Sequence, residues 1–128
     1  MFELEGLDHV ALGVADVKRS ADWYVEVLGF EHRYKGMWDD VPTFVGKGRT
    51  AIALFPKRNG QENATESRAS GGMLHLAMRA DRKNFIAAQE ALKARGIDFH
   101  FQDHEISHSI YFRDLDGIRL EITTYEIS

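Results

Sequence analysis

The stretch SHSIYFRDLDGIRLEITTY, residues 107–125, predicts a β-hairpin. Two runs of alternating side chains, Ser109–Arg113 and Ile118–Tyr125, flank a segment of two Asp residues and a Gly, which is typical of a tight turn. Because side chains alternate between the two faces of a strand, the second run presents Glu121 among polar neighbours on one face and aliphatic residues on the other. That polar face either lies in solvent or lines a functional site.

The first half of the chain, residues 5–57, predicts a β-α-β-β-β unit. Leu7–Val14 alternates as a strand, with His9 and the small residue Ala11 on one face. Asp16 is a candidate N-cap of a helix that ends at Gly29. Three further strands are expected at residues 30–35, 43–45 and 50–55.

The second half, residues 73–126, repeats this pattern. Met73–Arg79 alternates with His75 on the same face as a small residue, Ala77, and a helix is expected between Asp81 and Gly96. Strands follow at residues 97–101, 109–113 and 118–125. The polar residues 58–72 between the halves predict a linker. The sequence therefore predicts a single domain built by duplication of one supersecondary unit.

Composition narrows the possible partners and cofactors. The 128 residues carry 16 basic and 20 acidic side chains, and no cluster of Lys and Arg predicts a nucleic-acid or membrane surface. No run of roughly 20 apolar residues predicts a membrane helix, and the opening MFELEGLDHV lacks signal-peptide features, so we expect a cytoplasmic protein. Since cysteine is absent, a metal ion would be held by His and carboxylate side chains.

Two histidines and one glutamate form the candidate metal-ligating set. His9 and His75 occupy matching positions in the repeat, and Glu121 lies on the polar face of the last strand. Two His and one carboxylate are the donors of divalent metal sites with open coordination positions. The alternative for each residue alone is structural, with the histidines hydrogen-bonded in the core and the glutamate at the surface.

Three segments of the chain carry a family resemblance. The runs LDHVALGVADVKRSADWYVEVLGF (7–30), MLHLAMRA (73–80) and YFRDLDGIRLE (111–121) resemble the vicinal oxygen chelate superfamily. Its members include glyoxalase I, extradiol dioxygenases, fosfomycin-modifying enzymes and bleomycin-binding proteins. The resemblance implies an α+β fold in which two paired β-α-β-β-β modules form open, cupped, mixed β-sheets, with helices on the outer face and a metal inside the cup.

The resemblance also implies the metal ligands. His9, His75 and Glu121 fall on family ligand positions, whereas a fourth position used by glyoxalase I falls on Ala53, which cannot bind metal. The missing carboxylate weighs against a glyoxalase I mechanism. The remaining 2-His-1-carboxylate set favours Fe(II), with Mn(II) or Zn(II) as alternatives.

Tyr111 and His108 are the candidate catalytic residues. Tyr111 precedes Glu121 by ten positions and shares a strand face with Ser109, so its phenol would reach a metal-bound oxygen as a donor or general acid. His108 adjoins the same strand, and a histidine side chain can act as an acid or a base. The structural alternatives are a strand-rim tyrosine and a solvated histidine.

The expected function is that of a metal-dependent enzyme of the glyoxalase or dioxygenase type, acting on a small substrate that chelates the metal through adjacent oxygens. The alternatives are a fosfomycin-type thiol transferase and a non-catalytic, bleomycin-resistance-like protein. Ala11 weakens the fosfomycin reading, because a hydroxyl residue is usual at that position. The resemblance also implies a homodimer, in which exchanged modules would put His9 of one chain beside His75 and Glu121 of another.

Overall fold

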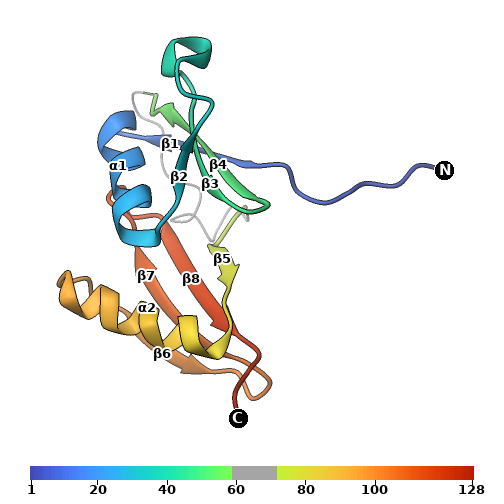
Figure 1. Ribbon diagram of the computed structural model, residues 1–128, viewed down its shortest axis with the longest axis vertical. Helices are drawn as coiled ribbons and strands as arrows, with labels where there is room; N and C mark the ends of the chain where they lie inside the picture. The colour runs from blue at the N-terminus through green and yellow to red at the C-terminus, as the bar shows by residue number, and fades with distance from the viewer. Residues whose placement is uncertain (59–71) are drawn as a thin grey trace. The chain divides into compact units, whose positions relative to one another are not determined.

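The computed structural model describes residues 1–58 and 72–128, which form two compact units within residues 1–61 and 62–128 (Figure 1). Most of the predicted linker 58–72 lies outside the described residues. Each unit contains one four-stranded sheet and one long helix. The two units are described one at a time below.

The first unit has the order β1, α1, β2, η1, β3, β4. Its elements are β1 (Val10–Val14), α1 (Val17–Leu28), β2 (Glu31–Arg33), the 3-10 helix η1 (Met37–Asp40), β3 (Thr43–Lys47) and β4 (Thr50–Pro56). The strands lie in the order β1-β4-β3-β2, with β1 parallel to β4 and the other pairs antiparallel.

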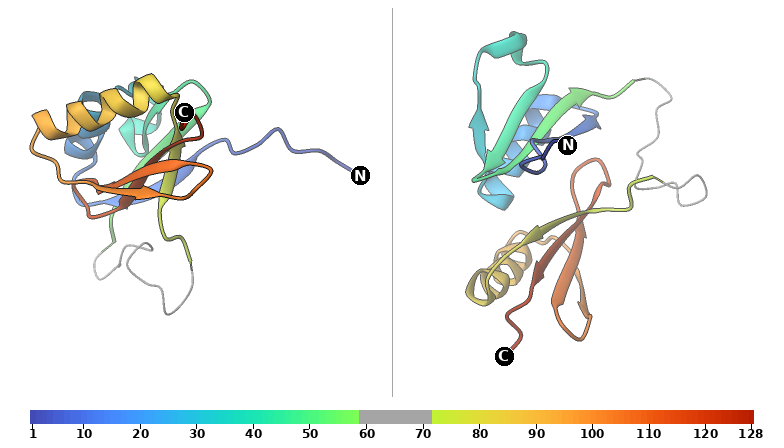
Figure 2. Two further views of the ribbon diagram at one scale, coloured as in Figure 1. Left: turned by 90° about the horizontal axis from the view of Figure 1, so that it is seen from below. Right: turned by 90° about the vertical axis from the view of Figure 1, so that its right-hand side faces the viewer.

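The second unit repeats this topology. Its elements are β5 (Leu76–Arg79), α2 (Arg82–Ala94), β6 (His100–Asp103), β7 (His108–Arg113) and β8 (Arg119–Thr124). The strands lie in the order β5-β8-β7-β6, again with only the first pair parallel. Both sheets are open in the views of Figure 2. The predicted α+β fold, with two β-α-β-β-β modules and mixed sheets, is confirmed.

The helices begin and end where the sequence signals predict. The Asp16 and Asp81 carboxylates accept hydrogen bonds from backbone N–H groups three residues on, at 3.0 and 2.8 Å. These bonds satisfy donors that a helix leaves unpaired in its first turn. Gly29 ends α1 in the left-handed conformation with φ 71°, which a residue without Cβ adopts at no steric cost.

One face of each sheet is covered by the helix of its own unit. α1 contacts β2, β3 and β4, and α2 contacts β8. Alternate strand residues therefore form two cores, and the intervening residues lie on the opposite face of each sheet. The buried apolar side chains include Leu12, Val14, Tyr24, Val45, Ile52 and Leu54 in the first unit, and Phe85, Leu92, Ile110, Phe112, Leu120 and Ile122 in the second.

Several strand boundaries differ from the sequence prediction. The parallel ladders begin at Val10 and Leu76, so His9 and His75 lie one residue before their strands rather than inside them. β6 begins at His100, three residues later than predicted. The predicted loop 35–42 contains the short helix η1. β1 and β5 are edge strands with a single neighbour, so their length is set by where that neighbour pairs.

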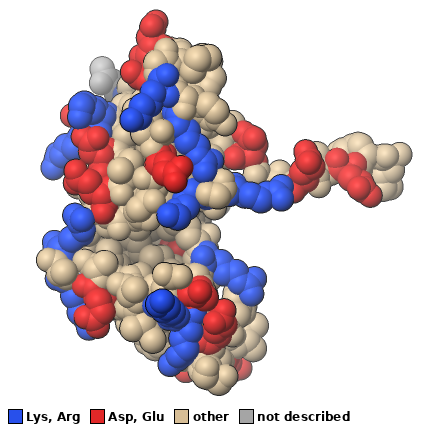
Figure 3. All heavy atoms as spheres, in the orientation of Figure 1, with Lys and Arg blue, Asp and Glu red and all other residues tan. Residues whose placement is uncertain are grey.

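Basic and acidic side chains are interspersed over both units on the face shown in Figure 3. Within the described residues, no helix combines the length and apolarity needed to cross a bilayer.

Candidate metal centre

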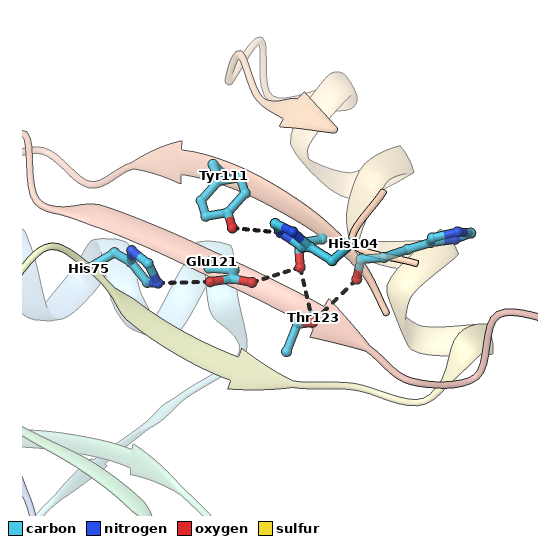
Figure 4. A network of polar contacts seen from close by, with 7 residues as sticks. His75, His104, Tyr111, Glu121 and Thr123 are labelled. Carbon is cyan, nitrogen blue, oxygen red and sulfur yellow. Dashed lines mark hydrogen bonds and ion pairs between the residues drawn. The ribbon is translucent and has the colours of Figure 1, made fainter. Parts of the chain in front are cut away.

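Glu121 is the central residue of the candidate site. It lies on β8 and is buried, with 7% of its surface exposed. Its Oε1 lies 2.9 Å from His75 Nε2 (Figure 4). A buried carboxylate is costly unless it is hydrogen-bonded or paired, so a fixed partner is expected for this one. The structure brings together these two predicted ligands within the second unit.

The second carboxylate oxygen is held by Ser109. The Ser109 hydroxyl donates to Glu121 Oε2 at 2.6 Å and lies 3.0 Å from Thr123 Oγ1. Thr123 in turn donates to the backbone carbonyl of His108 at 3.3 Å. Hydrogen bonds to a carboxylate that do not involve the metal fix its orientation and tune its donor strength. Ser109 is therefore a positioning residue for Glu121.

The histidine of the pair has one nitrogen unused. His75 Nδ1 is buried and has no hydrogen-bond partner among the residues the structure describes. The ring also meets the edge of Tyr111, with centroids 5.7 Å apart at 80°. A buried unpaired nitrogen calls for a ligand, a water or a displaced partner.

His75 Nε2 and Glu121 Oε1 therefore face each other, and the hydrogen bond from Ser109 fixes the orientation of the carboxylate. This is the chemistry that a borderline divalent ion such as Fe(II), Mn(II) or Zn(II) prefers, and it fits part of a metal site. In the described part of the chain, no three His, Cys, Asp or Glu side chains gather into a complete set. A third ligand has to come from outside the His75–Glu121 pair.

Tyr111 adjoins the pair on the same sheet face. It is directly opposite Glu121 in the β7–β8 register, and its phenol oxygen lies 3.0 Å from His104 Nε2 (Figure 4). The Arg119 guanidinium lies over the ring, 4.3 Å from its centroid. Burial and then the Glu121 carboxylate raise the pKa of Tyr111 above its usual range, while Arg119 acts in the opposite direction. The phenol is therefore protonated at neutral pH.

His108 is placed away from these residues. It lies on β7, where its side chain alternates with Ser109 and Tyr111, and its ring meets Phe101 at 5.3 Å on the side of the sheet that α2 covers. His108 Nε2 is 3.6 Å from Asp103 Oδ1. The histidines that contact Tyr111 are His75 and His104 instead.

The strand registers show which residues of the first unit correspond to this site. Ala77 pairs with Glu121 across β5 and β8, as Ala11 pairs with Ala53 across β1 and β4. Glu121 also pairs with Tyr111, as Ala53 pairs with Phe44. Ala53 is thus the counterpart of Glu121, and Phe44 the counterpart of Tyr111.

His9 is the counterpart of His75, two residues before the paired alanine. Its Nδ1 lies 2.7 Å from Asp8 Oδ2, and its ring meets Phe44 edge to face at 5.2 Å. The position on β4 that corresponds to Glu121 is Ala53, so β4 supplies no carboxylate there. His9 lies in the first unit and stays a predicted third ligand.

Three residues were missed as site residues by sequence reasoning. The position of Ser109 could have been predicted, because residues 109 and 111 lie on the same face of the strand and Tyr111 was a candidate. Arg119 shares parity with Glu121 in the same way. The position of His104 could not have been predicted in this way, since it lies in the turn between β6 and β7, whose conformation follows from the Asp103 carboxylate and the positive φ of Glu105.

Comparison with known proteins places this arrangement in a family. The model of the Glyoxalase/Bleomycin resistance protein/Dioxygenase superfamily matches residues 6–122. Metallothiol transferase FosB of Staphylococcus epidermidis is 26% identical over 95% of this chain and 83% of its own length. Catechol-2,3-dioxygenase of Bacillus subtilis is 27% identical over 91% of this chain, which spans 40% of that protein.

Solved structures agree on the fold. A glyoxylase/bleomycin resistance protein/dioxygenase domain from Frankia superimposes with a TM-score of 0.75 and 26% identity, covering 95% of this chain and 93% of that one. An integron cassette protein from the Halifax Harbour sewage outfall gives 0.72 and 27%, covering 94% and 99%. The resemblance seen in the three sequence runs is thereby confirmed, and the chain belongs to the Glyoxalase/Bleomycin resistance protein/Dioxygenase superfamily.

Proposed function

We propose that this protein is a metal-dependent enzyme of the glyoxalase or dioxygenase type, acting on a small substrate that binds the metal through adjacent oxygens. One observation carries the proposal. The buried carboxylate of Glu121 faces His75 Nε2 with one oxygen and is held by Ser109 through the other. A hydrogen bond from Ser109 to the outer oxygen fixes the orientation of the carboxylate, as such bonds do for carboxylates that bind metals.

His75, Glu121 and His9 would hold the ion in this proposal, with Fe(II) favoured over Mn(II) and Zn(II). When bound, the ion would act as a Lewis acid on the substrate oxygens and would leave coordination positions open. The protein's own contribution is to hold the carboxylate in a fixed orientation. Ser109 does this by donating to Glu121 Oε2, and no rearrangement of the carboxylate is then needed on binding.

Tyr111 supplies a proton at a defined atom. Its pKa is raised by burial and by Glu121, so the phenol holds its proton at neutral pH and donates rather than accepts. His104 lies 3.0 Å from the phenol oxygen and is exposed, which gives the proton a route to solvent. We therefore assign the acid role to Tyr111 and the relay role to His104 in place of His108.

The proposed proton transfer differs from that of an enzyme whose metal ion has four protein ligands. The first-unit counterpart of Glu121 is Ala53, so no carboxylate is available there to accept a substrate proton. Proton transfer through such a carboxylate is excluded from the proposal. A reaction in which Tyr111 stabilises a developing oxyanion fits the residues better.

Thiol transfer to a small epoxide-type substrate is the second candidate. It is favoured by the similarity to metallothiol transferase FosB over 95% of this chain. The two candidates are separated by assaying the metal-loaded protein in parallel. Catechol with dissolved oxygen tests ring cleavage, through oxygen uptake, and fosfomycin with a low-molecular-weight thiol tests transfer, through phosphorus NMR. Turnover in only one assay decides between them.

The competing class is a protein that binds a drug-like ligand and uses no metal. Metal analysis of protein purified without chelators tests it directly. We expect close to one equivalent of metal per chain and a thermal shift on adding Fe(II), Mn(II) or Zn(II). Less than about 0.1 equivalent together with no thermal shift would refute the enzyme proposal.

The third ligand and the expected homodimer are tested together by mixing His9→Ala with His75→Ala protein. If the site is shared between chains, half of the dimers are mixed and one of their two sites is intact, so metal binding returns to about a quarter of the wild-type value. If the site lies within one chain, no mixture restores binding. Retained metal binding in His9→Ala alone would show that His9 is not a ligand.

A further inference from the structure

A cluster of aromatic rings on the first unit is not used by the proposed chemistry. Phe44 on β3 meets Tyr34 at 5.4 Å and Trp38 at 5.6 Å, and Tyr34 meets Trp38 at 5.9 Å between ring centroids. Phe44 also meets the ring of His9 at 5.2 Å. It alternates along β3 with Val45, which is fully buried, so the cluster lies on the sheet face opposite that core. We call Tyr34, Trp38 and Phe44 the aromatic platform.

The platform is exposed although its residues are large and apolar. Tyr34 is 58% exposed and Trp38 is 51% exposed. Side chains that form a core are buried, so these two do not serve as core residues. Both residues also have positive φ, 55° in each case, a conformation that bulky side chains rarely adopt. Backbone conformations of this kind persist where the surrounding structure imposes them, and they are enriched at ligand-binding sites.

The ring spacing determines what kind of ligand fits. Centroid distances of 5.4–5.9 Å are those of rings in direct contact, so nothing fits between them. A cage for a quaternary ammonium group needs space at its centre, and this cluster has none. What it offers is an outer surface on which a flat ring can stack. The charged residues of the same loop, Lys35, Asp39 and Asp40, give no positive surplus that would favour an anion.

The neighbouring histidine argues for a small ligand rather than a protein partner. Phe44 joins the platform to His9, the predicted metal ligand of the first unit, through a ring contact. The half-exposed Tyr34 and Trp38, with the more buried Phe44, offer roughly 300 Å² of surface. A stable protein interface buries about 800 Å² on each partner.

We propose that the aromatic platform binds the planar, uncharged aromatic ring of the substrate, next to His9. This assignment rests on the proposed function, because it takes His9 to be part of the metal centre.

The test uses metal-free protein and 2-naphthol, a flat uncharged probe. In Trp23→Phe protein, Trp38 is the only tryptophan, and its fluorescence is expected to be quenched saturably by the probe. Affinity is measured by equilibrium dialysis, so that variants without Trp38 can be compared. Trp38→Leu is expected to weaken binding by about 10-fold, the effect of losing one stacking partner.

The matched control is Phe101→Leu. Phe101 is also half-exposed, at 46%, but it lies in the second unit, where its ring meets Phe85 of α2. Binding of 2-naphthol should be unchanged in this variant. Phe44→Leu is a second platform variant, and circular dichroism verifies that each protein is folded.

Equal affinity of wild-type protein, Trp38→Leu and Phe44→Leu for the probe would overturn the proposal. So would conversion of a dimer to a monomer by Trp38→Leu with no probe binding to either protein, because the platform would then be an interface. Glu121→Gln separates this proposal from the proposed function. That variant should lose metal uptake and still bind 2-naphthol, and either property can fail without the other.

Discussion

The two units share one topology and one set of strand registers, yet they present different chemistry on equivalent positions. The second unit carries His75, Tyr111 and Glu121, held by hydrogen bonds and ring contacts. The first carries His9, Phe44 and Ala53 at the corresponding places. The backbone therefore determines where three side chains meet, and the residue types alone determine whether they form a polar centre or an apolar surface.

The difference between the units extends to the surrounding residues. In the second unit the polar centre has its own support, since Ser109 orients Glu121 and His104 contacts Tyr111. In the first unit, Phe44 is supported by Trp38 instead. Each unit therefore supports its own residues at these positions with its own contacts.

Glu121→Gln removes the largest difference between the units and should have the largest effect. The neutral amide cannot supply a charged donor, so metal affinity is expected to fall by more than about 100-fold, beyond the loss typical for a supporting residue. Inductively coupled plasma analysis and metal titration measure it. Glu126→Gln is the control, because that carboxylate accepts a hydrogen bond from the backbone N–H of Arg82 at the start of α2. Equal metal content in the two variants would contradict the assignment.

Tyr111→Phe makes the second unit match the first at Phe44. Loss of the proton donor should lower kcat by about 100-fold and leave metal content unchanged. Steady-state kinetics on whichever substrate proves active provides the measurement. Tyr125→Phe is a close control, since that tyrosine also lies under an arginine, Arg79, at 4.5 Å but away from Glu121. A parallel loss in both variants would argue for a structural role.

Ser109→Ala tests whether the second unit needs its positioning residue. Without the 2.6 Å bond to Glu121, metal affinity should fall by about 10-fold. Isothermal titration with Mn(II) gives the affinity. Ser20→Ala, a buried serine in α1, should leave it unchanged. If alanine at 109 binds metal as tightly as serine, the carboxylate is positioned by other groups.

Arg119→Met probes the smallest difference, the charge over the Tyr111 ring. Arg119 lowers the phenol pKa that burial and Glu121 raise, so its removal should raise that pKa further. Because the folded pKa exceeds the unfolded value of 10.0, the native state binds the extra proton above pH 10, and stability should fall as the pH rises through that range. Ultraviolet titration near 295 nm follows the phenolate. Arg79→Met, over Tyr125, is the comparison.

The fold was predictable because local signals and periodicity agreed. Asp16 and Asp81 behave as the N-caps that their positions indicate, and the alternation around Val10–Val14 and Leu76–Arg79 produces the two parallel edge strands. The loop around Trp38 was not predictable. Its positive φ angles at non-glycine residues run against local backbone preference, so the sequence does not indicate them.

The candidate site was predictable only in part. Strand parity brings Glu121 beside Tyr111, and the repeat pairs it with His75. Because side chains alternate along β7, His108 lies on the sheet face away from Glu121. Its nearness to Ser109 in the sequence was therefore a poor guide to its place. The contact between His104 and Tyr111 depends on a turn whose shape is set by side-chain hydrogen bonds, and no periodic signal encodes it.

The number of residues in the turn between β7 and β8 matters more to the candidate site than the residue types at its tip. Asp114 is buried, and its Oδ1 accepts hydrogen bonds from the backbone N–H groups of Asp116 and Ile118 at 2.9 Å each. Leu115 at the tip is exposed, so exchange of its side chain should be tolerated. Inserting or deleting one residue shifts β8 by one position and turns Glu121 to the other face of the sheet. We therefore expect homologous proteins to vary in residue type at the tip of this turn and to keep its length.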